Sequence, residues 1–140
     1  MRSDTKRALA LLQEEGLTCA ACCGEEILKS CARGVKPLLD WLDEGISLRG
    51  YCAADKVVGA GAAYLYVLLQ IDELYAAVVS ENASKILTRY GILLHFETLA
   101  PHIVNRAGDG ICPIEQAVAE ATDPADALAR IRRRLAELKK

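Results

Sequence analysis

Residues 49–84 constrain the fold of this chain more than any other stretch, because long apolar runs there are broken by charge at only a few points. The run 73–79 is apolar after Glu73 and does not alternate, which predicts a central strand covered on both faces. Asp55 and Lys56 stand at the predicted start of a helix over 54–69, and Glu81 follows the strand. Helix starts beside a strand end are where open α/β sheets bind ligands.

The rest of the chain alternates helix and strand signals. A helix over 3–15 with Ser3 or Asp4 as its cap precedes a predicted hairpin over 17–32. A helix from 35 to 45, a helix from 80 to 90 and a strand over 92–96 follow. This order predicts a three-layer α/β/α domain with a mixed sheet of four or five strands. The expected strand order is second hairpin strand, first hairpin strand, 74–79 and 92–96.

The last predicted helix is amphipathic. We expect residues 1–122 to form the α/β domain and residues 123–140 to form a C-terminal helix with an apolar stripe. That stripe must pack on the domain or on a second subunit, so a homodimer is one of the two expectations. Its members are Leu128, Ile131, Leu135 and Leu138.

The composition of the chain limits the classes of binding partner that we expect. With 140 residues, 52% hydrophobic and 26% charged, the chain predicts one globular domain. A net charge of −2 argues against nucleic acid as the partner. No apolar run reaches the ~20 residues that a membrane helix needs, and the first residues lack a secretion signal. We therefore expect a cytoplasmic protein whose six cysteines are reduced thiols.

Gly59 and Gly61 lie inside the predicted central helix. Each glycine costs roughly 1 kcal/mol of helix propensity relative to alanine. The expected reason is close packing of the helix backbone against the sheet. The pair lacks the third glycine of a dinucleotide fingerprint and follows no predicted strand directly, so it does not predict a dinucleotide site.

Four motifs carry a resemblance to a known family: GVKPLLDWL, ADKVVGAGAA, the step Val79–Ser80–Glu81–Asn82, and NRAGDGICPIE. They are similar to those of an uncharacterised bacterial domain family that is placed in the cytidine deaminase-like fold superfamily. The resemblance covers residues 4–118 and leaves the last helix outside. It implies a deaminase-like α/β fold.

The zinc chemistry of that superfamily is not expected here. Zinc deaminases use a His or Cys two residues before a catalytic Glu, and a P-C-x-x-C motif at the next strand-to-helix step. Cys52 and Asp55 have the wrong separation, and residues 80–84 contain no cysteine. Catalytic zinc needs three protein ligands. The sequence therefore predicts no metal and no cofactor.

The candidate catalytic residues are Asp55, Lys56 and Glu81. Asp55 and Lys56 predict an acid–base pair or a substrate clamp, with a helix-dipole Asp and a solvated Lys as the alternative. Glu81 and Asn82 predict contacts to a ligand. Ser80 belongs to the same candidate ligand site, although it could act only as a helix cap.

A glycine-flanked loop supplies the remaining candidates, Asn105, Arg106 and Asp109. Arginine recognises anions through two parallel hydrogen bonds, so the loop predicts a ligand contact or a lid, with a surface turn as the alternative. Cys112 precedes Pro113 at a helix start, where a thiol can be reactive, but an incidental cysteine is the other interpretation. We expect one crevice, lined from two helix starts and from this loop by Asp55, Lys56, Glu81, Asn82, Arg106 and Asp109.

Other polar groups are expected to be structural. Cys19 and Cys22 lie three apart on a predicted strand, so they should face opposite sides and cannot share a metal. His95 and His102 have no ligand partner at helical spacing. The basic residues of the last helix predict a solvated face, because no stacking aromatics accompany them.

The sequence therefore predicts a protein that binds a small nucleotide-like or other anionic metabolite. It is either an enzyme that works without zinc or an inactive fold kept as a ligand sensor or interaction module. A thiol or metal protein using the region 19–31 is a third hypothesis. The substrate and the reaction are left open.

Overall fold

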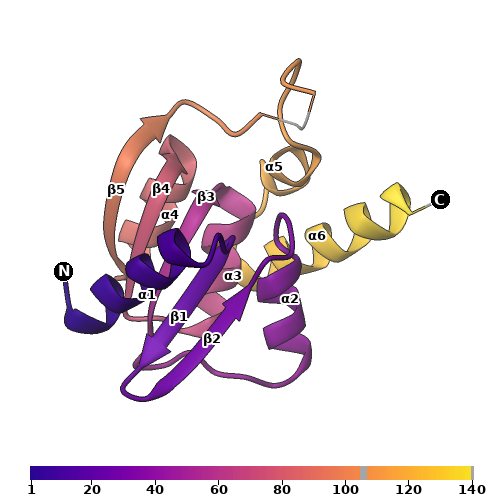
Figure 1. Cartoon of the computed structure of the whole chain (residues 1–140). Coiled ribbons are helices and arrows are strands. Elements are labelled where there is room, and N and C mark those ends of the chain that lie inside the picture. The colour runs from indigo at the N-terminus through magenta and orange to yellow at the C-terminus, as the bar shows by residue number, and fades with distance from the viewer. Residues whose placement is uncertain (105–106, 140) are drawn as a thin grey trace.

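The computed structural model describes residues 1–104 and 107–139. Its helices lie on both sides of one sheet (Figure 1). The elements are α1 (Ser3–Glu14), β1 (Cys19–Cys23), β2 (Glu26–Ser30), α2 (Lys36–Asp43), β3 (Cys52–Val58), α3 (Ala60–Leu69), β4 (Glu73–Ser80), α4 (Glu81–Arg89), β5 (Leu93–Ala100), α5 (Pro113–Val118) and α6 (Pro124–Leu138).

The sheet is mixed and has five strands in the order β2-β1-β3-β4-β5. β1 pairs antiparallel with both β2 and β3, while β3, β4 and β5 run parallel. The α/β class, the hairpin and the mixed sheet are thus confirmed. Both parallel connections pass through a helix, as the alternating pattern predicts.

The predicted strand order lacked β3. The sequence indicated a helix from about residue 54, but residues 52–58 form a strand between β1 and β4, and α3 begins only at Ala60. Ala53 and Ala54 are both fully buried. Their small side chains suit a strand that helices cover on both faces, so tertiary burial overrides the helical preference of alanine.

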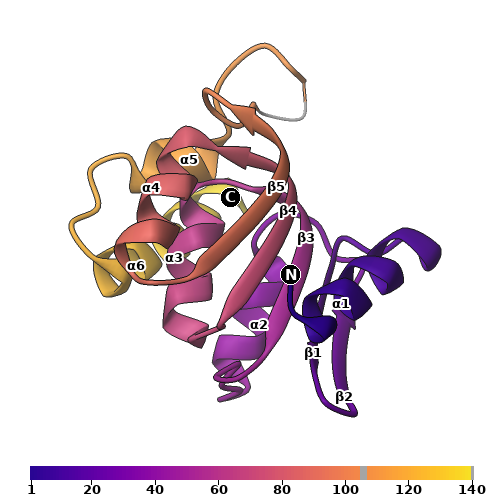
Figure 2. The same cartoon turned by 90° about the vertical axis from the view of Figure 1, so that its left-hand side faces the viewer.

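Helices cover the two faces unequally (Figure 2). On one face, α1 places Ala8 and Leu12 against Ala20, Ala54 and Tyr75. The larger core lies on the opposite face, beneath α2, α3 and α4. Its largest fully buried side chains include Leu38, Leu65, Tyr66, Leu69 and Leu87.

The C-terminal helix packs against this larger core. α6 contacts α3 and α5, and its residues Ala127 and Ile131 are fully buried. Asp123 caps the helix by accepting a hydrogen bond from the Asp126 N–H at 2.7 Å. α6 therefore braces α3 and α5, the two helices that border the pocket described below.

Among residues 1–104 and 107–139, no helix is long and apolar enough to cross a membrane.

Candidate functional site

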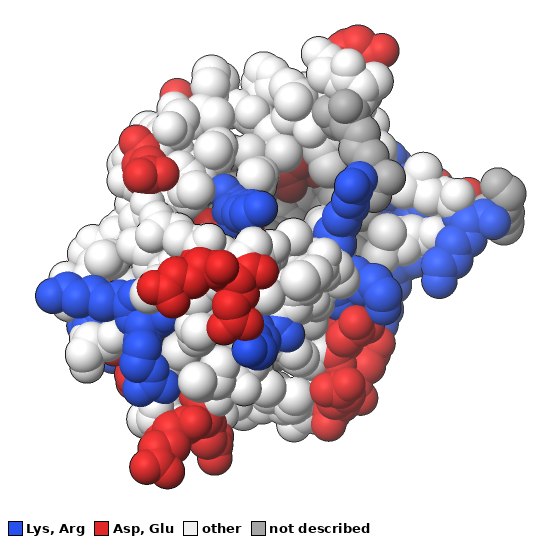
Figure 3. Space-filling model, viewed as in Figure 1, with Lys and Arg blue, Asp and Glu red and all other residues white. Residues whose placement is uncertain are grey.

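A pocket of about 240 Å³ opens at the carboxyl end of β3, beside the start of α3. It collects residues from the loop before α2, from β3 and from both ends of the segment that leads into α5. In Figure 3 this face of the molecule is hollowed, with acidic atoms inside and basic side chains at the border. The lining residues are Thr18, Arg33, Gly34, Val35, Asp55, Lys56, Val57, Gly59, Ala62, Ile103, Cys112, Ile114 and Glu115.

Asp55 is the half-buried acid of the pocket. Its Oδ2 accepts a hydrogen bond from Tyr66 Oη at 2.7 Å, and its Oδ1 accepts one from the Val57 N–H at 3.3 Å. Desolvation raises the pKa of Asp55 to about 7, although these hydrogen bonds favour the ionised form. The carboxyl group therefore changes its charge near neutral pH.

Tyr66 and Cys19 surround Asp55 on the core side. Both are buried, Tyr66 on α3 and Cys19 directly across the antiparallel pair from Asp55. Burial and the neighbouring carboxylate raise the pKa of Tyr66 and that of Cys19 above their ordinary values. Both groups therefore stay protonated, and Tyr66 is the one of the two that donates a hydrogen bond to Asp55.

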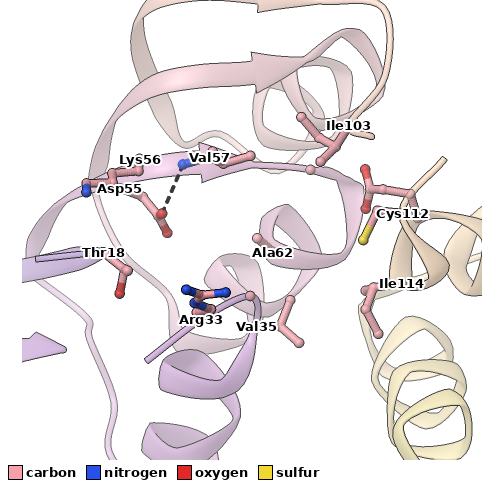
Figure 4. Close-up of a pocket in the computed structure, with 13 residues that line it drawn as sticks. Thr18, Arg33, Val35, Asp55, Lys56, Val57, Ala62, Ile103, Cys112 and Ile114 are labelled. Atoms are coloured by element: carbon pink, nitrogen blue, oxygen red, sulfur yellow. Dashed lines mark hydrogen bonds between the residues drawn. The ribbon is translucent and has the colours of Figure 1, made fainter. Parts of the chain in front are cut away.

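Arg33 is the cation that faces Asp55 across the pocket (Figure 4). Thr18 fixes the chain just before it, because Thr18 Oγ1 donates to Ala32 O at 2.6 Å and lies 2.9 Å from Ser30 O. The Arg33 side chain is exposed and makes no hydrogen bond or ion pair with any described residue. Its guanidinium is therefore available to a ligand.

Glu115 fills the other end of the pocket and caps α3. Its Oε1 accepts from the Ala60 N–H at 2.6 Å, and its Oε2 accepts from the Gly61 N–H at 3.0 Å. The helix has no side-chain cap of its own. A carboxylate at this position also matches the positive end of the helix dipole.

Gly59 and Gly61 are required by α5 and not by the sheet. A Cβ on Gly59 would lie 2.3 Å from Glu115 Oε1, and a Cβ on Gly61 would lie 2.6 Å from Ile114 Cγ2. The expectation of close packing was correct, but the partner is α5. The two glycines leave the space in which α5 brings its carboxylate to the start of α3.

The structure places Asp55 and Lys56 on β3 and not at a helix start. Consecutive residues of a strand alternate between its faces, so the two side chains do not form a pair. The Asp55 carboxyl group bonds Tyr66, whereas the Lys56 side chain is exposed and makes no hydrogen bond or ion pair with a described residue. Both still line the pocket.

Cys112 also lines the pocket, whereas the predicted site residues Ser80, Glu81, Asn82 and Asp109 are not among the residues that line it. Ser80 is the buried cap of α4 and accepts from the Ala83 N–H at 3.1 Å. Glu81 and Asn82 are exposed in the first turn of α4, and Asp109 is exposed in the loop before α5. Asn105 and Arg106 lie outside the described residues. The described residues thus show no single crevice of the predicted composition.

The cysteines lie on different faces of the sheet. Cys19 belongs to the larger core and Cys22 to the cluster under α1, so their predicted opposite orientation is confirmed. Cys52 likewise alternates with Asp55 along β3 and faces α1. Among the described residues, no group of three His, Cys, Asp or Glu side chains could hold a metal ion.

For several residues in or behind the pocket, the neighbouring sequence did not indicate a role at the site. Arg33 precedes a glycine in what the sequence indicates only as a turn, and Glu115 lies 55 residues from the helix that it caps. Tyr66 lies in an apolar run without a helical period. The one available signal was the glycine pair, which indicates that some group approaches the helix start closely.

A second buried carboxylate, Glu73, lies at the start of β4, at the end of the parallel strand opposite to the pocket. It accepts hydrogen bonds from the Arg2 N–H at 2.8 Å and from Thr5 Oγ1 at 2.5 Å, and His95 Nε2 lies 3.4 Å away. Glu73, and neither Ser3 nor Asp4, therefore accepts one of the free backbone N–H groups at the start of α1, which has no side-chain cap of its own.

Comparison with known proteins identifies the family of this chain and a similar solved structure. The model of DUF1893 (TM1506), a domain of unknown function, matches residues 7–135, so it includes most of α6, which the sequence had placed outside the resemblance. The crystal structure of a DUF1893 family protein (TM1506) from Thermotoga maritima is 28% identical, with a TM-score of 0.85; the match covers 98% of this chain and 92% of that chain. No curated protein matches significantly. The chain belongs to the DUF1893 family.

Proposed function

We propose that this chain binds a small anionic metabolite in the pocket between the end of β3 and the start of α5. One observation carries the proposal. The Asp55 carboxyl group, held by Tyr66 at 2.7 Å, faces a pocket of about 240 Å³ in which the Arg33 guanidinium has no partner among the described residues. A hydrogen-bonding acid and a cation without a partner, facing each other across one pocket, suit a ligand with two different polar ends.

The chemistry of the walls indicates the class of ligand. An arginine side chain recognises a carboxylate or phosphate through two parallel hydrogen bonds. Asp55 accepts N–H groups such as those on the edge of a nucleobase. Between them the pocket is apolar, with Val35, Ile103 and Ile114 on its walls. Its volume is below the roughly 300–1,000 Å³ of drug-sized ligand sites, so the occupant is a small nucleotide-like or other anionic metabolite.

Asp55 also suits the pocket to proton transfer. A carboxyl group with a pKa of about 7 can donate or accept a proton near neutral pH. We therefore place Asp55 as the acid–base group and Lys56 as a second cation at the rim. Glu81, Ser80 and Asn82 keep their predicted ligand roles only if the ligand extends towards α4. If ligand binds without turnover, the protein is a sensor.

The proposal includes a cytidine deaminase-like fold that works without zinc, in a cytoplasmic protein. The order of hairpin, helix and parallel strands supports the fold assignment. The opposite orientations of Cys52 and Asp55 support chemistry without zinc, because these are the residues nearest to the deaminase metal motif.

Calorimetric titration tests the proposal with nucleobases, nucleosides, nucleoside monophosphates and small carboxylic acids as ligands. We expect at least one to bind, and Arg33→Gln to weaken it about tenfold or more, because a hydrogen bond to a charged group contributes about 1.5–3 kcal/mol. Arg49→Gln is the matched control, since Arg49 is also exposed and outside the pocket. Equal losses in both variants, or no binding by any ligand, would contradict the proposal.

A further inference from the structure

The edge strand β5 is a long apolar strand that faces solvent. It has eight residues, forms one end of the sheet, and contains neither proline nor lysine. Leu93, Phe96 and Leu99 are 53%, 44% and 47% exposed. The region over β5 in Figure 3 is mostly uncharged. Natural sheets usually protect such an edge with charge, proline or a covering element, because it readily pairs with another strand.

The backbone direction of β5 fixes how a further strand could pair with it. The Leu93 N–H donates to Asp72 O at 3.3 Å, so the backbone groups of Leu93 point towards β4. These groups alternate along a parallel ladder. The N–H and C=O groups of Leu94, Phe96 and Thr98 therefore point to the open edge, and an added strand must pair with these three residues.

We infer that a second copy of this chain adds its own β5 to this edge, antiparallel, about a twofold axis at Phe96. In the sequence LLHFETL, both positions three residues from Phe96 are leucine. In this register, His95 lies opposite Glu97 of the second copy, and Leu93 lies opposite Leu99. The His95 imidazole can donate a hydrogen bond to the Glu97 carboxylate of the second copy, and apolar pairs directly across a strand pair stabilise it.

Other registers satisfy fewer of these requirements. An antiparallel pairing must match outward residues with outward residues, so the twofold axis passes through a residue position. An axis at His95 or at Glu97 would set that residue opposite its own copy, and an axis at Leu94, Thr98 or Ala100 would leave more of the strand unpaired. Only an axis at Phe96 pairs the whole of 93–99 and sets His95 against Glu97. That pair falls at a position without hydrogen bonds between the strands, where the side chains come closest. The same patch serves both copies, as a closed dimer requires.

A groove beside Phe96 offers space for the second Phe96 side chain. It has a volume of about 390 Å³ and lies between α4 and β5. Directly opposite residues of an antiparallel pair place their side chains on the same face. The Phe96 ring of the second copy would therefore cover this groove. Its lining residues are Ser84, Thr88, Gly91, Ile92, Leu93, Leu94 and Phe96.

Sedimentation analysis of the full chain tests the dimer and does not depend on the proposed ligand. We expect a mass of twice 15.1 kDa at high micromolar concentration. Phe96→Glu should give the monomer mass, because two glutamates would face each other at the axis. Ile27→Glu is the matched control, since Ile27 is also 44% exposed but lies on the opposite edge strand β2. A monomeric wild type, or a dimer that only Ile27→Glu dissociates, overturns the inference.

Oxidative cross-linking tests the register in a Cys31→Ser background, which removes the exposed native thiol. Phe96→Cys should cross-link to itself, because the expected Cα separation of about 5.5 Å falls within the disulfide range. Thr98→Cys should cross-link only when mixed with Leu94→Cys. Self-linking of Thr98→Cys, or no link at Phe96→Cys in a dimeric sample, overturns the register.

Discussion

Tyr66 donates a hydrogen bond from α3 to Asp55 on the preceding strand, with Oη and Oδ2 2.7 Å apart. Tyr66 is fully buried, whereas Asp55 lines the pocket. A tyrosine hydroxyl in the core thus holds one oxygen of a carboxyl group that still faces the ligand space. This bond fixes the orientation of the Asp55 carboxyl group, and the buried surroundings of that group determine its charge.

The charge of Asp55 should make stability depend on pH. Its folded pKa of about 7 exceeds the ordinary value of 3.8, so the folded state binds more protons than the unfolded state between those values. Stability therefore falls as pH rises from about 4 to about 7, by a few kcal/mol at most. Asp55→Asn removes this contribution to the pH dependence of stability and keeps a hydrogen-bond acceptor for Tyr66. Denaturant unfolding of both proteins across this range should show wild type losing stability relative to the variant as pH rises.

Tyr66→Phe should raise the pKa of Asp55 further. The hydroxyl favours the ionised carboxylate, so its removal leaves desolvation less opposed. Titration of the Asp55 carboxyl carbon by NMR measures the change directly. A lower pKa in the variant would contradict the assigned role of Tyr66.

Gly61→Ala should destabilise the protein, although alanine is normally the better helix former by about 0.5–1 kcal/mol. The new Cβ would lie 2.6 Å from Ile114 Cγ2. Ile114→Ala removes that methyl group, so Gly61→Ala should become neutral or stabilising in the Ile114→Ala background. A double-mutant cycle measures this coupling. Additive effects would show that α5 does not limit the size of residue 61.

Glu115→Ala should cost about 1–2 kcal/mol of unfolding free energy, because the Ala60 and Gly61 N–H groups lose their acceptors. Glu120→Ala is the control: Glu120 is exposed, follows α5, and makes no hydrogen bond or ion pair with a described residue. Its effect should stay within about 0.5 kcal/mol. Thermal and denaturant unfolding distinguish the two variants, and equal effects would refute the capping role.

Thr5→Val should cost about 1–3 kcal/mol at neutral pH, because Thr5 is fully buried and its hydroxyl bonds Glu73 at 2.5 Å. Burial acts to raise the pKa of Glu73, but the bonds from Thr5 and the Arg2 N–H outweigh it and lower the pKa below 4.5. The stability from this shift is present above pH 4.5 and is lost as pH falls below it. The difference between wild type and variant should therefore shrink in acid, while the exposed control Thr88→Val changes little.

Local signals predicted the elements with clear boundaries. Ser80 caps α4, which was the alternative to its predicted ligand role. The uninterrupted apolar run after Glu73 was correctly predicted as a central strand. β3 was missed because Ala53 and Ala54 favour helix locally, and no turn signal other than Gly59 separates the strand from α3. The preference for strand there comes from burial on two faces, which single-sequence patterns do not contain.

The sequence predicted where the candidate site lies better than it predicted which residues form the site. Asp55 and Lys56 were expected beside a strand end and do line the pocket. Arg33 and Glu115 reach the same pocket from other parts of the chain, and their roles depend on how α2 and α5 dock. The predicted partners Glu81 and Asn82 follow the neighbouring strand, but the described pocket lies on the β1 side of it, towards Thr18 and Arg33.

The helices α1 and α3 both begin with backbone N–H groups that bond a carboxylate far away in the sequence, and this affects how parts of the molecule unfold. α1 obtains its acceptor from a residue 71 positions away and α3 from one 55 positions away. Neither first turn can complete its hydrogen bonds until the distant element has docked, so helix initiation and tertiary assembly become one cooperative event. Amide hydrogen exchange at Ala60 and Gly61 should then report the undocking of α5, and exchange at Arg2 the release of α1 from the sheet.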